Sequence, residues 1–198
     1  MLSAIVLAAG SSRRMGNKNK LMLPYKGKTV LTHTVENILA AGLEEVIVVT
    51  GFEAGLVEKA LQGLPIRFAH NPRHEEGLTS SIQAGVRAAT GKGYMICLSD
   101  MVLITPGEYL FLKEVFERRH PKDQHCICLP EYKGKKGNPV IFSSFHRETI
   151  LQHPEKEGCK GIVRVHPEHQ YCVNMPSGNI LIDMDDPGQY ELLEKRAP

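Results

Sequence analysis

The sequence lacks most features that would place it outside the ordinary globular proteins. Lysine and arginine number 24 against 22 aspartate and glutamate, so the formal net charge is only +2. This small balance, with basic residues scattered along the chain, argues against a nucleic-acid groove. No apolar run approaches the roughly 20 residues that a membrane span needs. No linker, repeat or low-complexity tract is visible, so we expect one domain over residues 1–198.

Cysteine is sparse and shows no pairing pattern. The chain has 5 cysteines, none in a C-x-x-C pair, which predicts reduced thiols and a cytoplasmic location. Cys126 and Cys128 would share one face of a strand, where buried core explains them better than a metal site. His166 and His169 are spaced i, i+3 but have no second ligand pair nearby, so we expect a solvated surface. The first residues lack the charged region of a signal peptide.

Two standard phosphate-binding patterns are also absent. Gly27-Lys28-Thr29 is not a G-x-x-x-x-G-K-[ST] loop, because Met22 stands at the first glycine position. Ala8 and Arg13 occupy the outer glycine positions of G-x-G-x-x-G. A nicotinamide-dependent oxidoreductase would need that fingerprint and an acidic residue ending the second strand, which reads Val49-Thr50-Gly51 instead. This alternative therefore has little support from the sequence.

Short apolar runs alternate with segments of helical periodicity along the chain. This alternation predicts an α/β layer fold, and the almost wholly apolar early strands should be buried between helices on both faces. The expected strands cover residues 4–8, 46–50, 66–69, 95–98, 126–129 and 139–142, and the expected helices cover 32–41, 53–61, 80–89, 108–118 and 187–195.

The loop after the first strand is the most informative segment. Residues 5–16 read IVLAAGSSRRMG, an apolar strand that runs directly into small residues and two arginines. Small side chains leave backbone N–H groups free to converge on an anion, and open α/β sheets bind ligands at the carboxyl ends of strands. Arg14 and the later Lys20 add positive charge. We interpret the segment as a phosphate-binding loop; an ordinary turn with solvated basic residues is the alternative.

Two acidic positions suit a metal ion. Asp100 follows the apolar run 95–98 and should project toward the same crevice as the first loop. Carboxylates hold Mg²⁺ together with substrate phosphates, although an N-cap aspartate would also explain this residue. A second cluster, Asp183-Met184-Asp185-Asp186-Pro187, precedes the last expected helix. Capping by Asp186 would explain one of its three carboxylates.

A second polar loop, containing Asn71 and the segment 77–85 (GLTSSIQAG), runs into a helix. A helix N-terminus of this kind offers free N–H groups and small side chains to a polar ligand. Capping of the helix by Thr79 or Ser80 is the alternative explanation.

The first loop resembles the signature of the MobA-like nucleotidyltransferases, a family that includes molybdenum-cofactor guanylyl- and cytidylyltransferases and cytidylyl-methylerythritol synthases. The resemblance rests on Leu7-Ala8-Ala9-Gly10-x-Ser12-x-Arg14-Met15-Gly16 followed by Lys20-Leu21. It implies a single-domain, three-layer α/β/α fold around a mostly parallel mixed sheet, as in nucleotide-diphospho-sugar transferases.

The resemblance also implies residue roles. Arg14 and Lys20 would be the catalytic contacts to the triphosphate, and Asp100 and Asp185 would hold Mg²⁺. The sequence departs from the family at Val102, where a proline is usual, and after Pro187, where an acidic pair is usual. The implied nucleotide-binding residues are Leu7, Ala8, Ala9, Gly10, Ser12, Arg14, Lys20, Asn71, Gly77, Ser80 and Ser81.

These roles describe a Mg²⁺-dependent nucleotidyltransferase, in which an acceptor phosphate attacks the α-phosphorus of a nucleoside triphosphate and expels pyrophosphate. Ala8-Ala9-Gly10 resembles cytidylyltransferases, so CTP is expected over GTP, and molybdopterin is the acceptor that the resemblance implies. A methyl group at Ala9 would narrow the floor under a base. A guanylyltransferase, a cytidylyltransferase for another sugar or alcohol phosphate, and a non-catalytic nucleotide-binding module are the alternatives.

Overall fold

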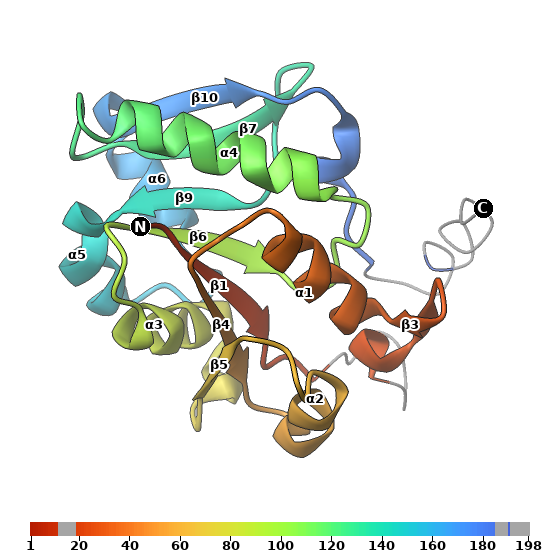
Figure 1. The fold of residues 1–198 in the computed structure, drawn as a ribbon. Coiled ribbons are helices and arrows are strands. Elements are labelled where there is room, and N and C mark those ends of the chain that lie inside the picture. Colours follow the sequence, from red (N-terminus) through yellow and green to blue (C-terminus); the bar gives the residue numbers. More distant parts are fainter. Residues whose placement is uncertain (12–18, 185–189, 191–198) are drawn as a thin grey trace.

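A computed structural model describes residues 1–11, 19–184 and 190 of the chain (Figure 1). Its strands are β1 (Ser3–Ala8), β2 (Pro24–Tyr25), β3 (Lys28–Thr29), β4 (Glu45–Thr50), β5 (Arg67–His70), β6 (Gly93–Leu98), β7 (Ile127–Tyr132), β8 (Lys135–Lys136), β9 (Val140–Ser143) and β10 (Gln170–Asn174). Its α-helices are α1 (Val30–Ala40), α2 (Ala54–Ala60), α3 (Leu78–Ala88), α4 (Pro106–Arg119), α5 (Arg147–Leu151) and α6 (Lys160–Val165).

One sheet organises these elements. Its strand order is β10-β7-β9-β6-β1-β4-β5, and β8 pairs with β7. β9 runs antiparallel to both β6 and β7, whereas β1, β4, β5, β6, β7 and β10 all run in one direction. The mostly parallel mixed sheet that the sequence predicts is therefore confirmed. The carboxyl ends of six strands meet at one edge, where ligands bind in folds of this class.

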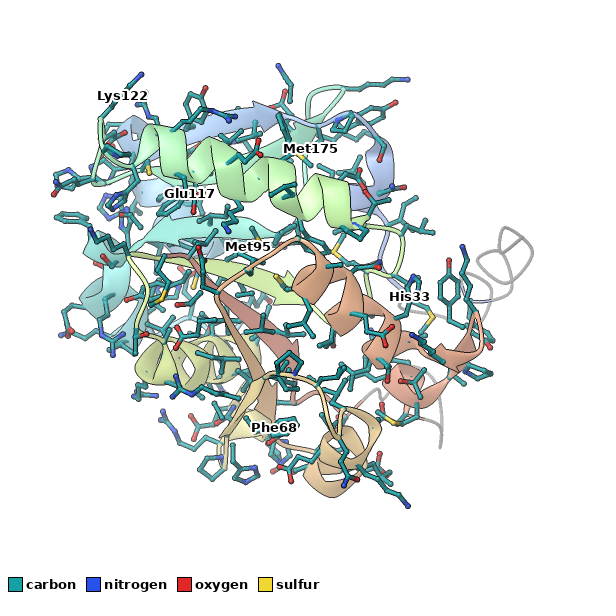
Figure 2. All side chains as sticks on the ribbon, in the orientation of Figure 1. His33, Phe68, Met95, Glu117, Lys122 and Met175 are labelled. Carbon is teal, nitrogen blue, oxygen red and sulfur yellow. The ribbon has the colours of Figure 1, made fainter. Side chains whose placement is uncertain are left out.

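Helices cover both faces of the sheet (Figure 1). α1, α2 and α4 pack on one face, and α3, α5 and α6 pack on the other. Every residue of β1 and β4 is buried, and side chains of β1 alternate between the layers, with Val6 on the α1 side and Ile5 on the α3 side. Met95 and Met175 belong to the α1 side (Figure 2). The expected three-layer arrangement is thus confirmed.

Most expected elements coincide with observed ones. The six expected strands fall on β1, β4, β5, β6, β7 and β9, and the helices expected over 32–41, 53–61, 80–89 and 108–118 fall on α1 to α4. The helix expected over 187–195 lies almost wholly outside the described residues. Cys126 and Cys128 are fully buried, as expected for core residues. Within the described ranges, no helix combines the length and apolar character that crossing a membrane requires.

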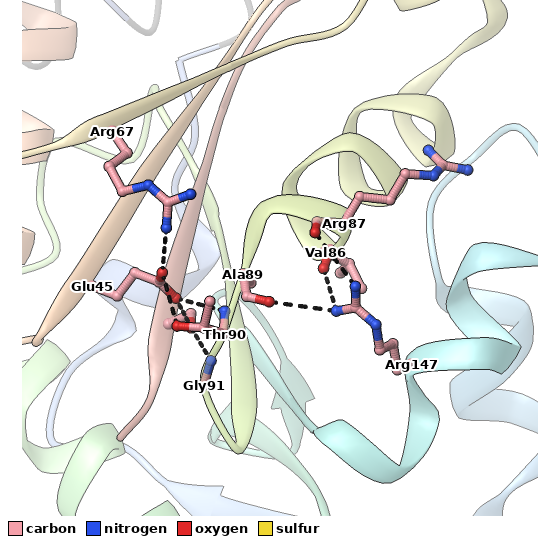
Figure 3. A network of polar contacts seen from close by, with 9 residues as sticks. Glu45, Arg67, Val86, Arg87, Ala89, Thr90, Gly91 and Arg147 are labelled. Atoms are coloured by element: carbon pink, nitrogen blue, oxygen red, sulfur yellow. Dashed lines mark hydrogen bonds and ion pairs between the residues drawn. The ribbon is translucent and has the colours of Figure 1, made fainter.

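A polar network fixes the amino-terminal edge of the sheet (Figure 3). Glu45 on β4 accepts hydrogen bonds from Ser3, from the backbone N–H of Thr90 at 2.9 Å and from Arg67 at 2.7 Å. Arg147 donates to backbone carbonyls at the C-terminal end of α3, where a cation complements the helix dipole. Burial alone would raise the pKa of Glu45, but the hydrogen bonds that Glu45 itself accepts outweigh burial and hold that pKa below its ordinary value.

Candidate active site

The carboxyl ends of β1 and β6 lie side by side. These strands are parallel neighbours in which Leu7 pairs with Leu98, and Asp100 follows two residues later with 7% of its surface exposed. The Ser99 hydroxyl donates to the carbonyl oxygen of Leu7 at 2.6 Å, which ties the end of one strand to the other. The structure therefore brings Asp100 to the first loop, as the sequence predicts.

Lys20, which follows the loop in the sequence, also contacts Asp100. It begins a short 3₁₀ helix, η2 (Lys20–Met22), and its ammonium group is ion-paired with the Asp100 carboxylate. The two side chains are only 18% and 9% exposed. An ion pair in such partly dry surroundings is screened less than one at the surface. The structure thus joins a predicted catalytic cation to a predicted metal ligand.

Two residues that the sequence analysis missed hold Lys20 in place. Asn19 caps η2, because its Oδ1 accepts from the backbone N–H of Leu21 at 3.1 Å. The same side chain donates through Nδ2 to Glu53 Oε2 at 2.9 Å, which connects η2 to the start of α2. Leu21 itself is buried in the core of the α1 side. An asparagine directly before a short helix was the available signal, since asparagine is a favoured N-cap.

Ala9 and Gly51 pack against each other directly after the paired ends of β1 and β4. The N–H of Phe52 donates to the carbonyl oxygen of Ala9 at 3.2 Å. A Cβ atom on Gly51 would lie 2.9 Å from the Ala9 Cβ and 2.6 Å from the His74 Cβ, so there is no room for one. Only 3% of Ala9 is exposed. Ala9 is therefore buried against Gly51 at the end of β1, and its expected role of narrowing the floor under a base stays a prediction.

Asn71, Gly77, Ser80 and Ser81 come together at the start of α3. The Asn71 amide donates to the Ser80 hydroxyl at 2.9 Å and to the Ser81 hydroxyl at 3.1 Å. The Ser80 hydroxyl lies 2.8 Å from the carbonyl oxygen of Gly77, to which it can donate. The three polar side chains are at most 5% exposed. Much of their hydrogen bonding therefore shapes this loop from within.

Gly77, not a hydroxyl residue, stands at the N-cap of α3. No side-chain hydrogen bond caps this helix, so the alternative of capping by Thr79 or Ser80 is wrong. Gly77 has φ +113°, and a Cβ there would lie 2.6 Å from the Lys156 carbonyl oxygen. The Thr79 hydroxyl bonds the carbonyl of Glu155 instead and accepts from the N–H of Gly158 at 2.9 Å. The segment 155–158 therefore closes over the start of α3.

Ser12, Arg14 and Asp185 lie outside the described residues. Their predicted roles stay predictions. The acidic segment is nevertheless anchored near the site, because Met184 is fully buried in a cluster with Val102, which follows Asp100 by two residues. Asp183, directly before it, is half-buried.

A family comparison agrees with this arrangement. The model of the MobA-like NTP transferase domain matches residues 4–171. The chain belongs to this family. This membership confirms the resemblance seen in the sequence. Nucleotidyl transfer is the activity of the family.

Several relatives are similar in sequence to this chain, over different lengths. The molybdenum cofactor cytidylyltransferase of Escherichia coli K12 is 26% identical over 196 residues, which cover 98% of this chain and 96% of that relative. A probable molybdenum cofactor guanylyltransferase of Methanosarcina acetivorans is 28% identical over 154 residues, which cover 76% of this chain and 66% of that relative. Nicotine blue oxidoreductase of Paenarthrobacter nicotinovorans is 34% identical, but over only 95 residues, which cover 48% of this chain and 47% of that relative.

A solved structure supports the same fold. A nucleotidyl transferase from Methanothermobacter thermautotroptrophicus superposes with a TM-score of 0.86 and is 26% identical, with 99% of this chain and 97% of that chain covered. The nucleotide-diphospho-sugar transferase fold expected of this MobA-like chain is thereby confirmed.

Proposed function

We propose that this protein transfers CMP from CTP to molybdopterin cofactor, with Mg²⁺ as the metal ion, and releases pyrophosphate. The observation that carries the proposal is the ion pair of Lys20 and Asp100 at the carboxyl ends of β1 and β6. A cation and a carboxylate held together beside a small-residue loop are the groups that phosphoryl chemistry uses.

The reaction needs no nucleophile from the protein. A phosphate oxygen of the acceptor attacks the α-phosphorus of CTP, a new P–O bond forms, and the bond from the α-phosphorus to the bridging oxygen breaks as pyrophosphate leaves. The protein must align the two reactants and offset the negative charge that gathers on the phosphates. Lys20 and Arg14 supply positive charge for this purpose.

Asp100 fits a magnesium ion by its chemistry and its placement. It offers carboxylate oxygens, the ligands that Mg²⁺ prefers, and it is held nearly buried at the ligand-binding edge of the sheet. We assign Asp185 as the second carboxylate, because it follows Met184, whose burial beside Val102 anchors that part of the chain near Asp100. When bound, the ion would cancel charge on the α-phosphate and on the departing pyrophosphate.

CTP and molybdopterin are chosen on the extent of similarity. The cytidylyltransferase relative matches almost the full length of both chains, whereas the guanylyltransferase relative matches 76% of this chain. The Ala8-Ala9-Gly10 sequence favours the same choice. Because Ala9 is buried against Gly51, it would act on base size by setting the position of this neighbour.

A pyrophosphate-release screen tests the proposal. Each of the four nucleoside triphosphates is incubated with molybdopterin and with other phosphorylated acceptors in Mg²⁺. We expect release with CTP and molybdopterin, and loss of release in Asp100→Asn. Release with GTP instead would favour guanylyl transfer. Nucleotide binding with no release from any pair would favour a non-catalytic module.

Calorimetric titration with CTP and GTP in Mg²⁺ measures the affinity for each nucleotide independently of nucleotidyl transfer. We expect tighter binding of CTP. Tighter binding of GTP would overturn the base assignment while leaving nucleotidyl transfer in place. Turnover of a nicotinamide cofactor, followed by its absorbance, would instead support the oxidoreductase class to which one partial relative belongs.

A further inference from the structure

Histidines gather at the end of the molecule opposite Asp100. His125 precedes β7, and His146 ends the 3₁₀ helix η4 (Ser144–His146). His166 is the N-cap of the helix η5 (Pro167–His169) before β10, and His169 is the last residue of that helix. Since β7 and β10 run in the direction of β1 and β6, their amino ends lie at the edge away from the site above. This is the end where α5 lies (Figure 1).

Three side chains of this cluster hold their ligand atoms at metal-binding spacing. His166 Nδ1 lies 3.3 Å from Glu168 Oε1, and His169 Nε2 lies 3.5 Å from the same oxygen. The ligand atoms of all three residues are within 4.8 Å of one another. Two ligands of a tetrahedral ion at about 2.0–2.2 Å are separated by roughly 3.4 Å, so the spacing from Glu168 to each histidine fits one ion, and binding would require the two rings to turn toward it.

The local backbone explains why these side chains align. Residues three apart on a 3₁₀ helix lie above one another, and His166 and His169 bracket η5 with that spacing. Their rings stack with centroids 5.0 Å apart and planes 8° apart. The solvated surface expected from the sequence is wrong in part, because the fold leaves these side chains only 28% and 16% exposed.

His146 adds an independent observation that points to a ligand. This residue is fully buried, and its Nε2 lies 2.8 Å from the carbonyl oxygen of His125. A carbonyl only accepts, so Nε2 carries the hydrogen. Its Nδ1 has no hydrogen-bond partner among the described residues, and neither has Nδ1 of His169. Buried ring nitrogens without partners are rare and costly.

The same histidine is arranged as metal ligands are. Metal-binding histidines usually donate their second ring nitrogen to a carbonyl or carboxylate, which fixes the tautomer and the ring orientation. The ring of His146 lies 5.4 Å from that of His166 and 5.3 Å from that of His169, between centroids. The fully buried ring is therefore directly beside the candidate ligands.

We propose that His166, Glu168 and His169 bind one Zn²⁺ ion beside the buried ring of His146. Imidazole nitrogens favour zinc and neighbouring transition metals, whereas Mg²⁺ prefers oxygen ligands. The site would therefore be chemically distinct from a magnesium site at Asp100. Zinc bound here would hold η5 in place directly before β10.

Zinc titration of the whole protein in excess Mg²⁺ tests this site. Protein freed of metal with a chelator and then dialysed is titrated with ZnCl₂ by calorimetry. We expect one Zn²⁺ per chain, and an affinity at least about tenfold weaker in His166→Gln and in Glu168→Gln. These variants leave the buried His146 unchanged, so we expect them to fold. His120→Gln, a histidine at the end of α4 that contacts Phe116, is the matched control and should bind as the unmodified protein does.

A second measurement reports the kind of ligand. Cobalt in tetrahedral nitrogen and oxygen surroundings gives visible absorption, which we expect from the unmodified protein and not from a His166→Gln, His169→Gln double variant. Undiminished zinc affinity in that double variant, or no zinc binding by the unmodified protein, would overturn the proposal and leave the three side chains as ion pairs only. Pyrophosphate release in Mg²⁺ should be unchanged in these variants, so the result is independent of the proposed transferase activity.

Discussion

The ammonium group of Lys20 is paired with the carboxylate of Asp100, although 80 residues of chain separate them. The pair forms because η2 returns the chain to the end of β1 while β6, the neighbour of β1, ends there too. Each charge lowers the desolvation cost of the other in a place where neither is fully hydrated. A change at either residue therefore also removes this ion pair from the other residue.

Replacing Asp100 with Asn should abolish most of the transferase activity. The amide keeps the shape of the side chain but removes the charge that pairs with Lys20 and that we expect to hold Mg²⁺. Loss of one preorganised electrostatic contact typically costs on the order of 100-fold in rate. Steady-state pyrophosphate release measures the loss, and circular dichroism checks the fold. Near-full turnover at saturating Mg²⁺ would rule out the metal role.

Replacing Arg14 or Lys20 with Ala should lower kcat rather than only raise KM. Both cations are proposed to offset charge that develops in the transition state. Arg13→Ala is the control, since Arg13 falls at a variable position of the loop signature, and its effect should be much smaller. Initial-rate kinetics over a range of CTP concentrations distinguish the cases. Equal losses at Arg13 and Arg14 would show that the phosphate contact is misplaced.

Replacing Gly77 with Ala should weaken nucleotide binding and the fold together. At φ +113° a side chain is strained, and its Cβ would meet the Lys156 carbonyl oxygen at 2.6 Å. Backbone strain of this kind costs on the order of 1–3 kcal/mol. Gly55→Ala on α2 is the matched control, because a Cβ there meets nothing within 4 Å. Thermal unfolding and CTP titration should change for the first variant and hardly for the second.

Replacing Glu108 with Gln should lower the stability near neutral pH by about 1–2 kcal/mol. Glu108 is 5% exposed and completes the capping box of α4, and it accepts from Ser177 at 2.6 Å and Asn179 at 3.0 Å. Burial would raise its pKa, but these hydrogen bonds outweigh burial and hold the pKa below its ordinary value. Denaturant unfolding at several pH values measures the difference.

The pH dependence of that difference has a definite sign. A carboxyl group with a lowered pKa in the folded protein contributes stability above its unfolded pKa, about 4.3 for Glu, and loses it as the pH falls through the folded value. The gap between the unmodified protein and Glu108→Gln should therefore narrow in acid. Glu114→Gln, on the exposed face of the same helix 3.5 Å from Arg118, should change stability by less than about 0.5 kcal/mol at any pH.

Local patterns predicted the first part of the fold well. The first strands are continuous apolar runs because they are buried on both faces, and Asp100 could be placed beside the first loop because parallel strands end at one edge. β10 escaped prediction because it is a short, half-exposed edge strand without a clear period. α5 and α6 were missed because each spans fewer than two full turns.

The sequence singled out residues for the site but not the contacts between them. The loop signature indicated Lys20 and Asp100 separately, yet nothing in the sequence paired them. The hydrogen bonds from the Asn71 amide to Ser80 and Ser81 were not predicted, and the expected nucleotide contacts of these residues stay predictions. His146 was overlooked because it is distant in sequence from His166 and His169, whereas Glu168 lies between these two histidines and was not weighed as a ligand. Long-range contacts of this kind depend on topology, which local spacing does not encode.

The position of β9 in the sheet sets the order in which the chain can fold. β7 is synthesised before β9, but β9 lies between β7 and β6. Until β9 has emerged, β7 has no strand of the β1–β6 part of the sheet to pair with. We expect residues 127–174 to join the sheet as one cooperative unit after the first half has formed, and their amide hydrogens to exchange together, separately from those of β1 and β4.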